Sequence, residues 1–81
     1  MTDDEARAAV IAAIALIAPE IDESELDEQA RLRQDLELDS LDFLRLIETL
    51  AVQTGVDIPE NDYIEVATIA GLIAYVASHS P

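Results

Sequence analysis

Residues 39–55 constrain the fold of this chain more than any other segment, because their apolar side chains recur at helical spacing between a start signal and a stop signal. At 100° per residue, five side chains fall on one face of a helix: Phe43, Leu46, Ile47, Leu50 and Thr54. Asp39 can cap the first turn, Asp42 complements the helix dipole, and Gly55 fits a C-terminal stop. We therefore predict a helix that starts at Asp39, ends near Gly55 and turns this face toward the core.

The opposite side of the same helix is also apolar. It carries Leu41, Leu44, Ala51 and Val52, with Arg45 and Glu48 among them. A helix that only had to face a core would not require this second stripe. We expect the stripe either to be covered by the preceding loop or to stay open for a protein partner.

The residues before and after this segment predict further helices. Thr2 and Glu5 have the spacing of a capping box, and the helix that follows should end at Pro19. Its core stripe is Ala6, Val10, Ala13, Ile14 and Ile17. Thr68 can cap a last helix whose inward residues are Ile69, Leu72, Ile73 and Val76, with Tyr75 at the edge of the core and Gly71 close to a neighbouring backbone. A short helical segment is expected between residues 58 and 67.

Residues 19–38 show no sustained period and are acidic. Spaced apolar residues should pin this connection to the core: Ile21, Leu26, Leu32, Leu36 and Leu38. A loop of this length usually has a function or crosses between helices. The predicted fold class is all-α, a four-helix bundle of three longer helices and one short helix, with a long loop between helices 1 and 2 and residues 1–81 in one domain.

Composition excludes several function classes. Eighteen acidic residues face four arginines and no lysine, for a net charge of −14, so a nucleic acid backbone would be repelled. Cysteine is absent, which removes disulfides and thiolate chemistry, and no apolar run approaches the ~18 residues of a membrane span. We expect a soluble, cytoplasmic monomer that binds neither nucleic acid nor membrane.

Catalytic and metal sites are not supported by the sequence. The one histidine, His79, falls in a tail that we expect to fray, and no Gly-x-Ser-x-Gly motif surrounds Ser40. An acidic triplet beginning at Asp35 imitates an EF-hand loop, but positions six and twelve are Ser40 and Leu46. We predict no catalytic residue and no dedicated metal site.

Ser40 instead suits an attachment point. At the first turn of a helix, unpaired backbone N–H groups and the dipole favour an attached anion such as a phosphate ester. An Asp-Ser pair taken alone is also a common helix cap, so its surroundings decide between the two interpretations.

Those surroundings resemble the acyl carrier protein family. The stretch Asp35-Leu36-Glu37-Leu38-Asp39-Ser40-Leu41-Asp42 is similar to the family's attachment signature. A helix, Ile58-Pro59, an acidic turn, Thr68-Ile69 and Ala74-Tyr75-Val76 follow in the family's order. The resemblance covers essentially the whole chain.

The resemblance implies a carrier and not an enzyme. Its cofactor would be 4'-phosphopantetheine, covalently attached to Ser40 within the motif Asp39, Ser40 and Leu41. A phosphopantetheinyl transferase would install the arm, whose thiol would hold acyl groups as thioesters, and acyl-processing synthase enzymes would be the other partners. The resemblance implies partner contacts at Leu41, Asp42, Leu44 and Glu48, and Ile58 and Tyr63 would lie where the arm rests. We expect Arg45, on the same face, to contact partners as well.

Some residues depart from the family pattern. Glu37 stands where a glycine commonly precedes the Asp-Ser pair, Arg45 and Ala51 occupy places that are often acidic, and Arg31 and Arg33 add positive charge near the site. These departures favour specialised, polyketide-like acyl chemistry over housekeeping fatty-acid synthesis. Two alternatives remain open at this point: an unmodified helical protein-interaction module, and an aminoacyl or peptidyl carrier.

Overall fold

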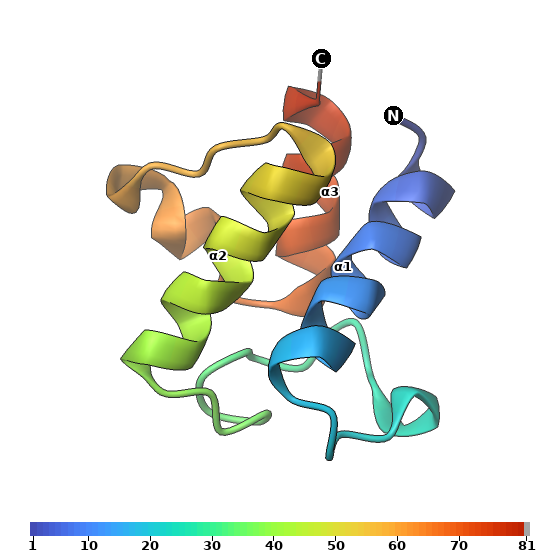
Figure 1. Ribbon diagram of the computed structural model, residues 1–81, viewed down its shortest axis with the longest axis vertical. Helices are drawn as coiled ribbons and strands as arrows, with labels where there is room; N and C mark the ends of the chain where they lie inside the picture. The colour runs from blue at the N-terminus through green and yellow to red at the C-terminus, as the bar shows by residue number, and fades with distance from the viewer. Residues whose placement is uncertain (81) are drawn as a thin grey trace.

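The computed structural model describes residues 1–80, apart from the side chain of Glu25. Along this part of the chain the elements are α1 (Asp3–Ile17), η1 (Glu23–Glu25), α2 (Ser40–Thr54), η2 (Glu60–Val66) and α3 (Ile69–His79), where η denotes a 3-10 helix. The predicted all-helical fold of three longer helices and one short helix is confirmed (Figure 1). The single turn η1 inside the long loop was not predicted.

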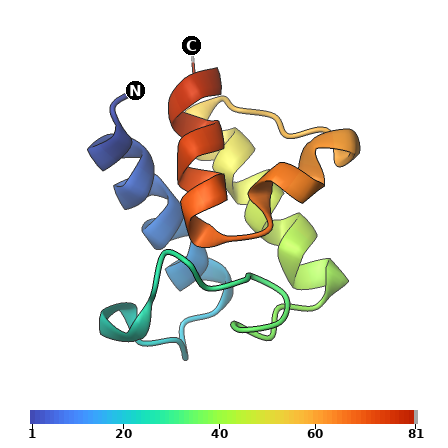
Figure 2. The same cartoon turned by 180° about the vertical axis from the view of Figure 1, so that it is seen from behind.

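α1 packs against both α2 and α3, while η2 packs against α3. α1 runs in the opposite direction to α2 and α3, so the two ends of the chain meet at one end of the molecule (Figures 1 and 2). The long loop crosses the other end, where α2 begins. This arrangement brings the loop close to Ser40.

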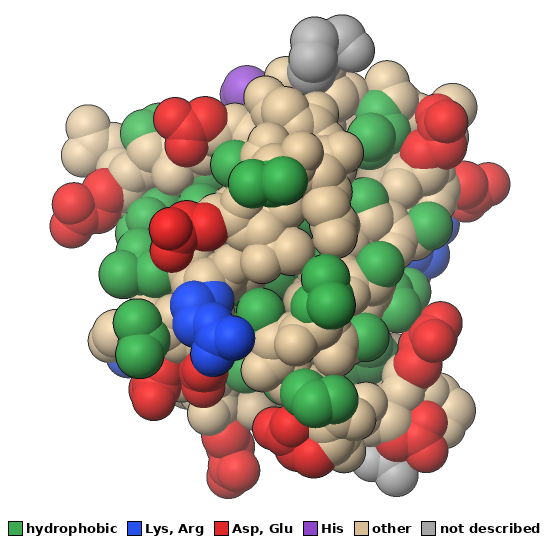
Figure 3. All heavy atoms as spheres, viewed as in Figure 1, with side chains coloured by type: hydrophobic (Ala, Val, Ile, Leu, Met, Phe, Trp, Pro, Cys, Tyr) green, Lys and Arg blue, Asp and Glu red, His purple; other side chains and the backbone are tan. Residues whose placement is uncertain are grey.

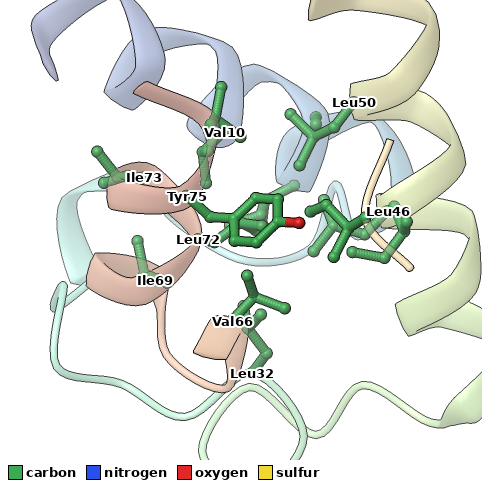
Figure 4. Packing of buried hydrophobic residues seen from close by; sticks show 14 of the residues in the cluster. Val10, Leu32, Leu46, Leu50, Val66, Ile69, Leu72, Ile73 and Tyr75 are labelled. Carbon is green, nitrogen blue, oxygen red and sulfur yellow. The ribbon is translucent and has the colours of Figure 1, made fainter. Parts of the chain in front are cut away.

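The core is built from the apolar faces that the helical period predicts. Its fully buried side chains come from the three long helices, the long loop, η2 and the link before η2. Among the largest, Figure 4 labels Leu32, Leu46, Leu50, Val66, Ile69 and Leu72. Ile17 and Thr54 are only half-buried. Tyr75, expected at the edge, is instead 5% exposed inside the core, because its hydroxyl donates a 2.7 Å hydrogen bond to Asp62 Oδ2.

The predicted N-caps and the stop at Gly55 are confirmed, while α1 ends at Ile17, two residues before Pro19. Thr2 and Glu5 form a reciprocal capping box, Asp39 caps α2, and the Thr68 hydroxyl accepts a hydrogen bond from the amide of Gly71. Gly55 ends α2 in the left-handed region, at φ 75°. A Cβ on Gly71 would collide with the carbonyl oxygen of Glu65, so glycine permits the expected close approach.

The prediction of a frayed C-terminal tail is wrong for Ser78 and His79. α3 continues through His79, and the Ser80 amide bonds the carbonyl of Val76. The His79 ring stacks on Tyr75 with 3.9 Å between centroids, which adds an ordered contact to the last turn. Pro81 lies outside the described residues.

The long loop is fastened to the start of α3. The Leu32 amide donates to the carbonyl of Ala67 at 2.9 Å, and the Ile69 amide donates to that of Ala30 at 3.1 Å. An ion pair of 2.8 Å between Arg7 and Glu28 joins the loop to α1. No helix in the described part of the chain is both long enough and apolar enough to cross a bilayer.

Candidate functional site

Ser40 is the first residue of α2 and is exposed to solvent. Asp39 Oδ1 accepts a 2.8 Å hydrogen bond from the amide of Asp42, which satisfies one of the free donors of the first turn. The amides of Ser40 and Leu41 find no acceptor among the described residues. The end of α2 therefore offers unpaired N–H groups and the positive end of its dipole beside the Ser40 hydroxyl.

A tight turn before α2 faces this helix end. Its two buried ends, Leu32 and Leu38, are joined by a 3.3 Å backbone hydrogen bond. Arg31, directly before the turn, pairs with Asp35 inside it at 3.2 Å. The Arg31 side chain and backbone N–H both donate to this carboxylate, which lowers the pKa of Asp35 below its usual value. The turn is thus fixed by two buried leucines and one ion pair.

Arg33 lies on this turn, next to the buried Leu32. Its Nη2 donates a 3.1 Å hydrogen bond to Ser40 Oγ, seven residues along the chain. The sequence placed Arg33 near the site but did not predict this contact. The sequence feature that could have indicated this contact is the position of Arg33 between Leu32 and Leu38, the two buried residues that fix the turn against α2.

A groove of about 760 Å³ opens beside Ser40, between α2, the turn and η2. Its lining residues are Arg33, Gln34, Leu38, Ser40, Phe43, Leu44, Glu60, Tyr63 and Ala67. The rings of Phe43 and Tyr63 meet edge to face in it, with centroids 5.1 Å apart. The groove combines an apolar wall with a few polar groups close to the serine.

Of the two residues expected where the arm rests, the structure places only one in the groove. Tyr63 lines the groove, as the resemblance implied. Ile58 does not, because it is 2% exposed and belongs to the core. It lies two residues after the equally buried Val56, and alternate residues of an extended link point the same way, here inward.

The second apolar stripe of α2 is left open by the loop. Leu41, Leu44 and Val52 are 66%, 43% and 87% exposed. Arg45 and Glu48 are exposed as well, while Asp42 and Ala51 are half-buried. Hydrophobic side chains accordingly appear among acidic ones on the outer faces of α1 and α2 (Figure 3).

The structure also divides this stripe. Leu44 lines the groove beside Ser40. Val52 instead borders a shallower depression of about 360 Å³ that also contains Leu16 of α1. Only the part of the stripe near Ser40 is therefore continuous with the candidate site.

Glu37 has a backbone conformation that explains why glycine is expected there. Its φ of 58° lies in the left-handed region, where an L side chain is disfavoured and glycine is not. This residue turns the chain from the loop toward Asp39. The departure from the family pattern at Glu37 thus retains the shape of the turn and introduces strain.

The arrangement suits a phosphate ester on Ser40 better than a catalytic serine. The one side chain that contacts the hydroxyl in the described part of the chain is a guanidinium, which donates hydrogen bonds and cannot act as a base. The Asp39 carboxylate is occupied as the helix cap. Free amides, a cation and an open groove are the features that an attached phosphate with a long substituent needs.

Comparisons with known proteins agree with this interpretation. A family described as "Phosphopantetheine attachment site" matches residues 8–76. The acyl carrier protein of Rubrobacter xylanophilus is 39% identical over 59 residues, which cover 73% of each chain. That of Rickettsia canadensis is 33% identical over 68% of this chain and 64% of its own, and that of Lactobacillus acidophilus is 28% identical over 74% and 75%.

Proposed function

Because the chain belongs to the acyl carrier protein family, we propose that Ser40 is the residue that carries its phosphopantetheine arm. Members of this family are carriers and not catalysts, and they hold 4'-phosphopantetheine covalently. The arm supplies a thiol that carries acyl groups as thioesters. We further propose that residues 1–81 act as one carrier domain.

The observation that carries the assignment to Ser40 is its position at the open start of α2. Its hydroxyl is exposed, 3.1 Å from Arg33 Nη2 and at the mouth of the groove. A transferase can reach the oxygen without unfolding any element. The amides of Ser40 and Leu41 and the Arg33 guanidinium would then stabilise the negative charge of the diester.

The test is the intact mass after incubation with coenzyme A and a phosphopantetheinyl transferase. We expect wild type and the matched control Ser24→Ala, which changes an exposed serine of η1, to gain one arm each. Ser40→Ala should gain none while keeping its fold, since the replaced side chain is exposed. An arm on Ser40→Ala would overturn the assignment.

We infer that partner enzymes dock on the part of α2 next to the site. The surface comprises Leu41, Asp42, Leu44, Arg45 and Glu48. Exposed leucines supply apolar contact, and the surrounding charges govern encounter and orientation. The partners proposed are the transferase and acyl-processing enzymes.

Within this role we propose a specialised, polyketide-like pathway. The support is Arg45, an exposed cation on the docking face, together with Leu41 and Leu44, which make the face less acidic than the net charge of −14 suggests. Binding to a housekeeping fatty-acid ketosynthase should therefore be weak and depend little on salt. Tight binding that falls steeply with salt would contradict this proposal.

A further inference from the structure

We propose that Arg33 is the counter-ion of the phosphodiester on Ser40 and directs the first part of the arm along the groove. This inference rests on the attachment at Ser40 proposed above. It assigns a positioning role to a residue of the loop and not of α2.

The contact already present at the hydroxyl supports this role. Arg33 Nη2 lies 3.1 Å from Ser40 Oγ, the atom that an ester bond would join to phosphorus. The non-bridging oxygens of the diester would therefore lie within reach of the guanidinium after a small side-chain rotation. Arginine recognises phosphate well, because its planar fork can donate two parallel hydrogen bonds to two oxygens.

The other arginines are engaged or lie elsewhere. Arg7 pairs with Asp4 and Glu28, and Arg31 pairs with Asp35. Arg45 is exposed on α2 and is not among the residues that line the groove. Because the chain has no lysine, Arg33 is the only cationic side chain lining the groove in the described part of the chain.

The local charge makes such a counter-ion important. A diester on Ser40 adds one negative charge beside the carboxylates of Asp39 and Asp42 and across the groove from Glu60. Like charges at this spacing repel each other, and the repulsion is strongest at low salt. Arg33 offsets this repulsion from a fixed position, because the turn that holds it is anchored by Leu32 and Leu38.

The position of Arg33 also gives the arm a direction. The guanidinium lies on the same groove as Phe43, Leu44 and Tyr63. A diester held by Arg33 would start the arm along that wall and away from the depression at Leu16 and Val52. We therefore expect the groove, and not the outer face of α1, to contact the bound arm.

The experiment compares thermal unfolding before and after loading in wild type, Arg33→Gln and Arg45→Gln. Both substitutions remove one exposed positive charge, so Arg45→Gln is the matched control for charge. Because Arg45 belongs to the proposed docking surface, intact mass first confirms complete loading of each protein, and only the change in Tm on loading is compared. Loading should lower Tm by roughly 2–5 °C more in Arg33→Gln than in wild type, as expected for loss of an exposed ion pair in a domain of this size. The control should behave like wild type, and the difference should shrink in roughly 1 M salt. Equal effects of loading in all three proteins would overturn the proposal.

A second measurement uses wild-type protein alone, before and after loading, so it does not depend on the folding of any variant. Wild type has four arginines, so 15N-labelled protein should give four assignable side-chain Nε–Hε signals. Loading should shift the Arg33 signal and leave that of Arg45 in place. Intact mass separates the two proposals: no arm on Ser40 refutes the attachment, whereas a loaded protein with an unchanged Arg33 signal refutes only the role of Arg33.

Discussion

α1 and α2 have the same length, 15 residues each, and each buries four residues along one face, yet their N-termini differ. At α1 the Thr2 amide donates to Glu5 Oε1 at 2.9 Å, and the Glu5 amide donates to Thr2 Oγ1 at 3.1 Å. The Thr2 N–H thereby lowers the pKa of Glu5. At α2 only the Asp39 side chain caps, and the next side chain, Ser40, faces Arg33.

The outer faces of the two helices also differ in the size of their exposed side chains. α1 exposes small side chains such as Ala8, Ala12 and Ala15, with Leu16 at its end. α2 exposes Leu41 and Leu44 directly beside its start. α1 thus closes its N-terminus with its own side chains, whereas α2 leaves backbone amides unpaired at its start and two leucines exposed beside them. The attachment and docking proposed above depend on this difference.

We expect the largest loss of stability from a substitution on the buried face of α2, and little loss from one on its exposed face. Leu46→Ala should destabilise the protein by about 2–5 kcal/mol, because Leu46 is fully buried and its removal leaves a cavity. Leu44→Ala should cost less than about 1 kcal/mol, since Leu44 is 43% exposed, and should weaken docking of partner enzymes instead. Urea unfolding and binding assays measure the two effects. Similar losses of stability in both variants would contradict the division.

Removal of the N-cap should have the same effect on stability in α1 and α2, but a different effect on loading. Thr2→Ala and Asp39→Ala should each cost about 1 kcal/mol, the usual loss for removing an N-cap. Only Asp39→Ala should also slow loading by the transferase, because it loosens the turn that presents Ser40. Asp39→Asn keeps an oxygen that can cap and removes the charge, so it tests which property matters. Equally slow loading in Thr2→Ala would contradict a role of the α2 start alone in presenting Ser40.

A smaller effect concerns the contact between α3 and η2. Tyr75 donates to Asp62 of η2, and this bond to a carboxylate raises the pKa of Tyr75 to about 12. An unfolded tyrosine titrates near pH ~10. The folded state thus retains the phenolic proton longer, and the stability from this bond is complete below pH ~10 and is lost as pH rises toward about 12.

We therefore expect Tyr75→Phe to lower Tm by a few degrees at neutral pH and to reduce the loss of stability at alkaline pH. Tyr63→Phe is the control, because the Tyr63 hydroxyl has no hydrogen-bond partner among the described residues. Thermal unfolding from neutral pH up to pH ~11.5 checks both expectations. The same alkaline slope in wild type and Tyr75→Phe would show that the Asp62 bond is not its cause.

The smallest effect lies in the turn before α2. Glu37→Gly relieves a left-handed conformation that costs an L residue about 1–2 kcal/mol, but it adds about 0.5–1 kcal/mol of chain entropy. We expect a net gain of about 0.5 kcal/mol and unchanged loading. Glu37→Val should be destabilised, because branched side chains tolerate this region poorly. Chemical denaturation of the pair measures the difference, and the opposite order would contradict the assigned strain.

Local signals explain what could be predicted from the sequence. The start and end of α2 depend on Asp39 and Gly55 and on the period of the residues between them, all within one segment. The exposure of Ser40 follows from the same local pattern. The capping box of α1 and the Thr68 cap of α3 were predicted for the same reason.

Contacts between distant segments explain what was missed. The bond from Arg33 to Ser40 exists because the loop is tied to the start of α3 through Leu32 and Ala67, 35 positions apart, and no periodicity reports such a bond. Ile58 was misplaced because only the packed core shows which side of an extended link faces inward. The burial of Tyr75 likewise depends on a partner, Asp62, in another element.

Attachment of the arm to Ser40 is tested by mass spectrometry, which locates the arm after loading and cleavage at arginine. Cleavage after Arg33 and Arg45 releases residues 34–45, in which Ser40 is the only hydroxyl-bearing side chain. We predict that this peptide alone gains the mass of one phosphopantetheine. An arm found on any other peptide, or a peptide of residues 34–45 that stays unmodified in a loaded protein, would contradict it.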